Sequence, residues 1–230
     1  MGQSALEHFA QVALTPSSSN WRIPIECGST VLLRRHWLKL GGAMNKGAVA
    51  NVLARVGALK RNGSFYIGTC NDAVIAGYAL DAPPSAIYIW KFVLPTYDDI
   101  EFLHLSLGRR IMTLTQTDGT NPEELDGFIR RDWRQFSEVS NVENLVDYIE
   151  TEGFEGTYAD WVRYLTHIKQ QEFDLAERLH GNAQATKRFS ELQTISKQFH
   201  ALLRAKELEG WEGCASLLDE WVKKTKATFC

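Results

Sequence analysis

The spacing of hydrophobic residues divides the chain into two regions. Up to about residue 119, apolar residues form short runs that alternate with polar ones or are continuous, as is typical of strands. From about residue 120, apolar residues recur every three or four positions, which indicates helices. The pattern predicts an α+β fold with an N-terminal mixed or antiparallel sheet and two helices, followed by a C-terminal bundle of four or five helices. No linker rich in Pro, Gly or Ser separates residues 1–119 from 120–230, so one continuous domain is the alternative.

The first region begins with a predicted helix over residues 4–14 and β-like segments over 21–26 and 30–40, the last of which is also compatible with a helix. A second helix is predicted over 44–61. Its apolar residues fall on one helical face, and they are Val49, Val52, Leu53, Val56 and Leu59. We expect Asn62-Gly63 to end this helix.

A β-hairpin is predicted after that helix, with residues 70–72 at its tip. The next segment, AIYIWKFVL at 86–94, is rich in β-branched and aromatic residues and nearly continuous in apolarity, as is typical of a strand covered on both faces. Pro95 and Asp98-Asp99 predict a turn. A further strand is predicted over 100–108, followed by a short strand in RRIMTLT at 109–115.

The second region contains clear helix signals. Asn121 or Thr120 can cap a helix that has Pro122 in its first turn, and Gly153 ends the next helix. Thr157 and Asp160 resemble a capping box, and we expect a long helix from there to about residue 180. That helix carries a heptad seam, whose members are Trp161, Leu165, Ile168, Leu175 and Leu179, with Glu172 at the remaining position. The following helix would pack against it as an antiparallel hairpin, and a last helix is predicted over 211–226.

Composition and charge narrow the function classes. The 230 residues are 44% hydrophobic and 23% charged, which is ordinary for a globular protein. The net charge of -3 argues against binding to nucleic acid or an anionic membrane through bulk charge. Residues 1–119 contain 11 Lys and Arg against 8 Asp and Glu, about +3, whereas residues 120–230 contain 14 against 20, about -6. A basic surface is therefore expected in the first region.

The spacing of the cysteines argues against a zinc site, and the first fifteen residues argue against secretion. The four cysteines form no C-x-x-C pair and no zinc-type pattern with histidine, so a structural zinc site is not predicted. The first fifteen residues lack the apolar core of a secretory signal. We therefore expect a cytoplasmic protein with free thiols. No apolar run approaches the length of a membrane span, so no membrane partner is expected.

Acidic residues in the predicted turn are the main candidates for catalysis. Asp98, Asp99 and Glu101 are close enough in sequence to hold Mg²⁺, which suggests a metal-dependent hydrolase as a third hypothesis. The turn preference of Asp explains the same residues, and we favour that interpretation. His36 and His104 belong to no recognisable catalytic set, and the usual nucleotide-binding loops are absent from the sequence. No catalytic residue and no cofactor is predicted.

A nucleic-acid-binding factor is the second hypothesis. A helix ending at Lys60-Arg61, followed at once by a hairpin, has the order of a recognition helix and a wing. Four more basic residues of the first region can add phosphate contacts, and they are Lys46, Arg55, Arg109 and Arg110. Basic residues at the end of a helix also complement its dipole, which is the simpler explanation.

A protein partner is the first hypothesis. The C-terminal helices carry Trp161, Trp211 and Trp221, and Trp is enriched among the residues that dominate protein interfaces, although core packing explains most tryptophans. Glu172 in the seam would need a partner if it were buried, and we favour exposure. These features predict a non-enzymatic interaction or scaffold subunit of a larger cytoplasmic assembly, which docks mainly through its C-terminal helices.

Overall fold

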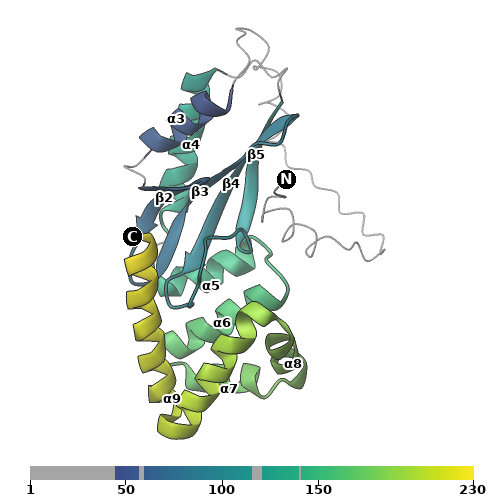
Figure 1. Cartoon of the computed structure of the whole chain (residues 1–230), viewed down its shortest axis with the longest axis vertical. Helices are drawn as coiled ribbons and strands as arrows, with labels where there is room; N and C mark the ends of the chain where they lie inside the picture. Colours follow the sequence, from purple (N-terminus) through teal and green to yellow (C-terminus); the bar gives the residue numbers. More distant parts are fainter. Residues whose placement is uncertain (1–44, 57–59, 116–120, 140) are drawn as a thin grey trace, which may run out of the picture. The chain divides into compact units, whose positions relative to one another are not determined.

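The α+β fold is confirmed. The computed structural model describes residues 45–56, 60–115, 121–139 and 141–230, which belong to one compact unit. They form a five-stranded, wholly antiparallel sheet in the order β1-β2-β3-β4-β5, followed by helices (Figure 1). The segments predicted over 4–14, 21–26 and 30–40, together with His36, lie outside the described residues.

The first described helix is shorter than predicted. Helix α3 (Lys46–Arg55) begins after Asn45, whose side chain accepts a hydrogen bond from the N–H of Ala48. Lys60 and Arg61 belong to strand β1 (Lys60–Asn62), so the prediction of a helix ending in these two residues is wrong. The reason is that Asn62-Gly63 forms a hairpin turn, in which Gly63 has a φ of 59°.

The predicted hairpin with its tip at residues 70–72 is confirmed. Strands β2 (Phe65–Cys70) and β3 (Val74–Asp81) pair antiparallel, and the Asn71 side chain accepts hydrogen bonds from two backbone N–H groups of the turn. The register shifts between Ile67 and Thr69. At Gly77 the strands approach so closely that a Cβ atom would lie 2.0 Å from the Tyr66 carbonyl oxygen, so only glycine fits there.

Strands β4 (Ala86–Pro95) and β5 (Gly108–Thr115) complete the sheet. The short strand predicted at 109–115 is confirmed, but the strand predicted over 100–108 is wrong because residues 100–107 are irregular. Alternating leucines suggested a strand, yet this segment buries Leu103 and Leu107 without forming a ladder. One backbone bond, from the N–H of Val93 to the carbonyl of Leu107, leads into β5.

Six helices follow in the described part of the chain. They are α4 (Pro122–Phe136), α5 (Val142–Thr151), α6 (Thr157–Lys169), α7 (Phe173–His180), α8 (Ala183–Glu191) and α9 (Gln193–Phe229). The predicted start of α4 is confirmed, since the Asn121 side chain accepts from the N–H of Glu123. Gly153, with a φ of 67°, follows α5 as predicted.

The long helix predicted from Thr157 to about residue 180 is wrong in two respects. Thr157 is the first residue of α6 and Gly156 precedes it, so no capping box forms. The chain also breaks between α6 and α7, where Gln171 has a φ of 60° and the N–H of Glu172 bonds the His167 carbonyl. This turn satisfies carbonyls at the end of α6. Glu172 is therefore an exposed residue at the start of α7 and not a member of a buried seam.

Helix α9 is bent. The helices predicted on either side of residue 210 meet at Gly210, whose φ of 69° and ψ of -155° interrupt the helical backbone of α9. Glycine tolerates this backbone conformation, which is costly for other residues. The second half of α9 runs back to the sheet (Figure 1).

Hydrophobic side chains lie on both faces of the sheet. On the first face, α3 and α4 pack against side chains of the strands, including Tyr66, Tyr78 and Ile89. On the second face, Phe229 of α9 and part of the 100–107 segment pack against Ile75, Phe92 and Leu94. A third cluster joins one end of the sheet to helices α5 to α9, and it includes Val93, Tyr97, Trp161, Phe199 and Leu218.

A disulfide joins Cys70 at the end of β2 to Cys230, with the two Cα atoms 5.8 Å apart. The prediction of free thiols is therefore wrong for these two residues, because cysteines 160 positions apart can meet only in the folded chain. Cys214 is free and buried, and burial raises its pKa to about 11. None of the helices in the described ranges combines the length and the apolar composition that crossing a bilayer requires.

Candidate functional site

The turn after β4 is buried and is held by helices from the second region. Asp98 is 2% exposed. Its carboxylate accepts hydrogen bonds from the Tyr158 hydroxyl at 2.8 Å and from Trp161 Nε1 at 3.2 Å, both on α6. Its carbonyl accepts a bond from Thr225 Oγ1 on α9 at 3.0 Å. One acidic residue of the turn thus joins the sheet to two helices.

Burial governs the charge of Asp98. Loss of water raises the pKa of its carboxyl to about 6, although the hydrogen bonds from Tyr158 and Trp161 act in the opposite direction. Both carboxylate oxygens have a donor within the protein, and almost none of the residue reaches solvent. In this arrangement the carboxylate orients helices, and a dissolved substrate has no access to it.

Asp99 and Glu101 lie in environments that differ from that of Asp98. Asp99 pairs with Lys224 of α9 at 2.5 Å, and its carbonyl accepts a bond from Gln198 Nε2 at 2.6 Å. Glu101 is exposed. The structure thus does not bring the three carboxylates together. Within the described ranges, no three His, Cys, Asp or Glu side chains are grouped so that they could hold a metal ion.

His104 lies beside the same buried node. Its ring meets the Tyr158 ring edge-on, with the centroids 4.8 Å apart. Loss of water lowers the pKa of His104 to about 4, so the ring is neutral at physiological pH. Tyr158 therefore touches two groups with shifted pKa values, the carboxyl of Asp98 and the imidazole of His104.

The six basic residues proposed to contact phosphate do not form one surface. Lys46 and Arg55 lie at opposite ends of α3, and Lys60 and Arg61 lie on the edge strand β1, where Arg61 packs over the Tyr66 ring. Arg109 and Arg110 are consecutive residues of β5 and point to opposite faces of the sheet. Helix and sheet geometry thus separate residues that are close in the sequence.

Arg109 belongs to an ion-pair cluster. Glu152, just after α5, accepts hydrogen bonds from Lys91 Nζ, at 2.6 Å, and from Arg109 Nη1. Burial alone would raise the pKa of Glu152, but the bonds from the two cations outweigh it and the pKa is lowered. Lys91 also lies over the rings of Phe136 and Tyr148. This cluster fixes α5 against the sheet.

Arg110 has a different environment. Its guanidinium carbon lies 4.9 Å from the ring centroid of Tyr88 and 5.7 Å from that of Trp90. Both aromatic residues belong to β4 and are partly exposed, and Arg110 is exposed. The group thus presents two rings and a cation on a sheet surface.

The tryptophans proposed as partner contacts differ in exposure. Trp161 and Trp221 are buried in the protein's own core. Trp211, next to the bend at Gly210, is partly exposed. Its ring stacks on that of Phe173 with the centroids 5.9 Å apart and the planes 7° apart, and Lys206 Nζ lies 4.2 Å from its centroid.

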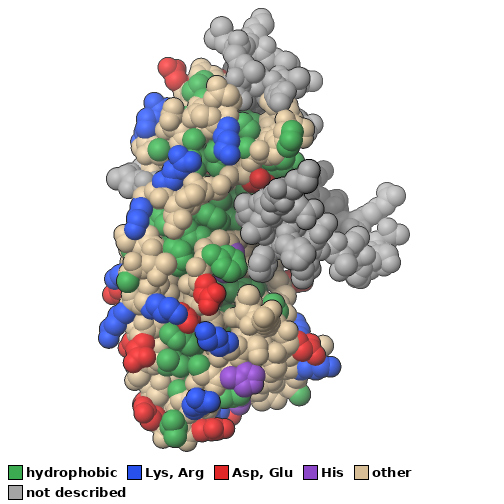
Figure 2. Space-filling view, in the orientation of Figure 1, with side chains coloured by type: hydrophobic (Ala, Val, Ile, Leu, Met, Phe, Trp, Pro, Cys, Tyr) green, Lys and Arg blue, Asp and Glu red, His purple; other side chains and the backbone are tan. Residues whose placement is uncertain are grey.

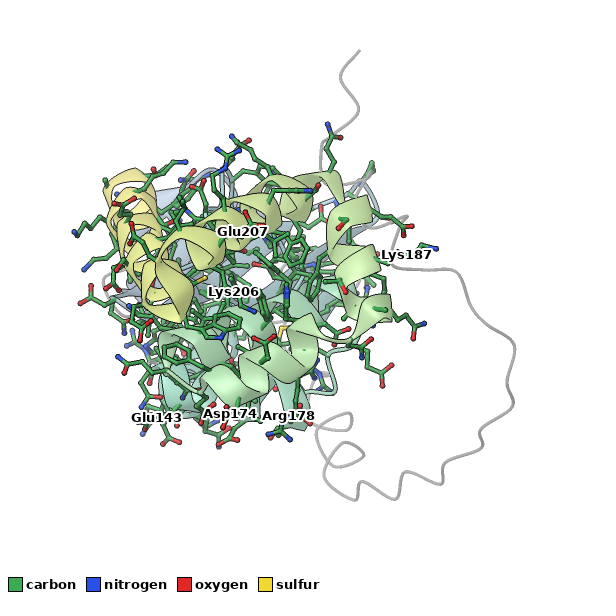
Figure 3. The ribbon with its side chains drawn as sticks, turned by 90° about the horizontal axis from the view of Figure 1, so that it is seen from below. Glu143, Asp174, Arg178, Lys187, Lys206 and Glu207 are labelled. Carbon is green, nitrogen blue, oxygen red and sulfur yellow. A yellow bond between two sulfur atoms is a disulfide. The ribbon has the colours of Figure 1, made fainter. Side chains whose placement is uncertain are left out.

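We call the surface around the bend of α9 the kink surface and define it by Phe173, Lys206, Leu208 and Trp211. Leu208 is 76% exposed, the more exposed of the two large hydrophobic side chains that stand out to solvent in the described chain. Lys206 reaches from α9 toward α7, where its Nζ lies 2.6 Å from Glu177 Oε2 (Figure 3). Helices α7 and α9 thus both contribute to this surface.

Sequence reasoning missed Tyr88, Trp90, Lys206 and Leu208. Tyr88 and Trp90 are two positions apart in a predicted strand, so their shared face was available as a signal. Lys206 and Leu208 lie just before Gly210, and a glycine within a helical pattern was the corresponding signal. Exposure itself depends on tertiary packing and carries no local sequence signal.

The chain is an α+β protein in which the buried Asp98 holds helices α6 and α9 against the turn after β4. No protein-family model, curated protein sequence or solved structure matches this chain.

Proposed function

We propose that this chain is a non-enzymatic subunit of a larger protein assembly and that it docks through the kink surface of its helical region. The observation that carries the proposal is the exposure of Leu208. This side chain is 76% exposed and lies close in sequence to the partly exposed Trp211. Trp is enriched among residues that dominate binding energy at interfaces.

The charged residues near Leu208 in the sequence indicate the charge expected on the partner. Glu207, Glu209 and Glu212 are exposed, and they outnumber the two nearby cations, which are the exposed Arg204 and Lys206, already paired with Glu177. We therefore expect a partner protein with a hydrophobic pocket for Leu208 and with Lys or Arg at the rim of that pocket. Attraction between the acidic and basic groups would weaken with added salt.

Two substitutions at the kink surface test this function. The tagged protein is purified from its native host after nuclease treatment, the stoichiometric partner is identified, and its affinity for each variant is measured by calorimetry. Leu208→Ser is expected to weaken binding by about 10- to 100-fold, because fully burying a leucine contributes roughly 1.5 to 3 kcal/mol. Glu207→Lys is also expected to weaken binding, and its effect should be larger at low salt than at high salt.

A matched control separates docking from a general effect of charge. Glu207 and Glu220 are both exposed glutamates of α9, on opposite sides of the bend. Glu220→Lys should leave the affinity within a factor of two of the wild type. Equal losses in the two glutamate variants, or unchanged binding by Leu208→Ser, would contradict docking through the kink surface.

Location in the cytoplasm is part of the proposal, and the Cys70–Cys230 pair tests it. Disulfides persist mainly in oxidising compartments and are rare in the cytosol. A cytoplasmic location therefore requires that the Cys70–Cys230 disulfide of the structure be reduced in cells, so that a maleimide reagent added at cell lysis would modify both residues. Protein in which the two cysteines resist modification until a reductant is added would contradict this location.

A further inference from the structure

We propose that the sheet surface formed by Tyr88, Trp90 and Arg110 binds the unpaired bases of single-stranded nucleic acid. We call it the stacking face. It lies on different elements from the kink surface and does not depend on the function proposed above. Figure 2 shows hydrophobic side chains gathered over the sheet, with Lys and Arg side chains around them.

The register of β4 and β5 builds the stacking face. Tyr88 and Trp90 are two positions apart on β4 and share a face, with about 6.6 Å between their Cα atoms. Ile89 pairs with Met112, so a regular ladder would place Ile111 opposite Trp90. A register shift at this point places Arg110 there instead. An irregularity of this kind often re-aims a side chain near a functional site.

The polar groups of the stacking face have unused capacity. Arg110 makes no ion pair within the described ranges, in contrast to Arg109, which binds Glu152 on the other face. Trp90 Nε1 is buried and has no hydrogen-bond acceptor in the described part of the chain. An anionic ligand would pair with the exposed Arg110, and it would meet Trp90 through the exposed part of the ring and not through the buried N–H.

Charged residues on the same face favour an anionic ligand. Lys60 on β1 lies opposite Ile67, whose side chain belongs to this face, and Lys60 is exposed. Among the strand residues that the structure describes on this face, one carboxylate, that of Asp81, lies opposite Tyr88 on β3. The cations at the two edges, Lys60 and Arg110, thus outnumber the acidic group between them.

Single-stranded nucleic acid fits these observations because its bases and phosphates match the two kinds of group present. Unpaired bases stack on aromatic rings and on the planes of arginine side chains, and open faces of antiparallel sheets bind two or three bases in this way. Arg110 can contact a phosphate while its plane remains close to the Tyr88 ring. The bases of a duplex are already stacked on one another and cannot reach the rings.

Fluorescence anisotropy with labelled 20-nucleotide oligo-dT and oligo-U, at 50 and 200 mM NaCl, tests the proposal on the full chain. Trp90→Leu and Arg110→Gln are each expected to weaken binding at least tenfold. Arg109→Gln, a matched change one residue away on the opposite face, should stay within a factor of two. A duplex of equal length should bind at least tenfold more weakly than the single strand.

A second pair of variants keeps the test valid if Trp90→Leu fails to fold. Tyr88→Phe retains the ring and should bind like the wild type, whereas Tyr88→Leu should lose at least tenfold. Absence of binding to both oligonucleotides at 50 mM NaCl, or equal losses in the Arg109 and Arg110 variants, would overturn the proposal. Loss of the protein partner in Trp90→Leu, with oligonucleotide binding unchanged, would overturn it as well and assign this face to a protein.

Discussion

The hydroxyl group of Tyr158 donates a 2.8 Å hydrogen bond to the buried carboxylate of Asp98. Tyr158 is on α6 and Asp98 follows the fourth strand, so this bond connects the helical region to the sheet. This connection depends on pH, because the hydrogen bond is stronger when the carboxyl is charged than when it is neutral.

Asp98→Asn is expected to change how stability depends on pH. The pKa of Asp98 in the folded protein is about 6, above its ordinary value near 3.8, so the folded state favours the protonated form. This group therefore supports folding fully below pH 4, and the support is lost as pH rises through 6. The loss is roughly 2 to 3 kcal/mol. In urea unfolding between pH 4 and 7.5, the free energy of unfolding should fall less steeply with rising pH in the variant than in the wild type. Identical slopes would contradict a buried, titrating carboxyl at Asp98.

His104→Gln is expected to act in the opposite direction. Burial lowers the pKa of His104 to about 4, so the folded state favours the neutral ring. Its contribution is present above pH 6.5 and is lost as pH falls through 4. Because part of His104 remains exposed, we expect its contribution to the free energy of unfolding to be smaller than that of Asp98, on the order of 1 kcal/mol over this pH range. In the same urea series, the variant should lose stability with rising pH more steeply than the wild type, and an equal or shallower loss would refute the assignment.

Glu152→Gln should destabilise the protein by about 1 to 3 kcal/mol, because it leaves the largely buried ammonium group of Lys91 without a carboxylate. Asp126→Asn is a matched control, since Asp126 pairs with the exposed Arg130 one turn away on α4. That change should cost no more than about 0.5 kcal/mol. Thermal unfolding monitored by circular dichroism gives both values. Equal costs would show that the Glu152 cluster contributes no more than a surface pair.

Cys230→Ser is expected to lower the stability of the oxidised protein and leave the reduced protein nearly unchanged. The disulfide to Cys70 spans 160 residues. A cross-link across so long a loop reduces the conformational entropy of the unfolded chain, which stabilises the folded protein by up to about 5 kcal/mol. Melting temperatures with and without dithiothreitol measure the effect. The same melting temperature for oxidised wild type and for the variant would show that the cross-link does not stabilise the fold.

The sequence predicted the class of fold, the start of α4 and the end of α5, because these depend on local signals. Asn121 and Asn141 cap α4 and α5 with their own side chains, and Gly153 ends α5. The turn at Asn62-Gly63 shows the limit of such signals, since the same dipeptide can end a helix or form a hairpin. Pairing with β2 decided between the two, and pairing is not a local property.

The sites were harder to predict than the fold. Two acidic residues after Pro95 indicated a turn, but the burial of Asp98 results from contacts with α6 and α9 that are distant in sequence. Of the heptad pattern of residues 161–179, Trp161, Leu165 and Ile168 are buried, whereas Leu175 and Leu179 are only partly buried. The backbone breaks at Gln171 and removes Glu172 from the pattern. Arg110 meets Trp90 through a register shift, which no single strand's sequence reveals.

The bond from Thr225 to the carbonyl of Asp98 joins residues separated by 127 positions. Ribosomes add roughly 5 to 20 residues per second, so about 6 to 25 seconds pass between the synthesis of one partner and the other. During that interval the turn after β4 has neither its contact with α9 nor the cover that Phe229 gives to the sheet. The nascent sheet therefore exposes the apolar surface that Phe229 later covers until α9 has been made.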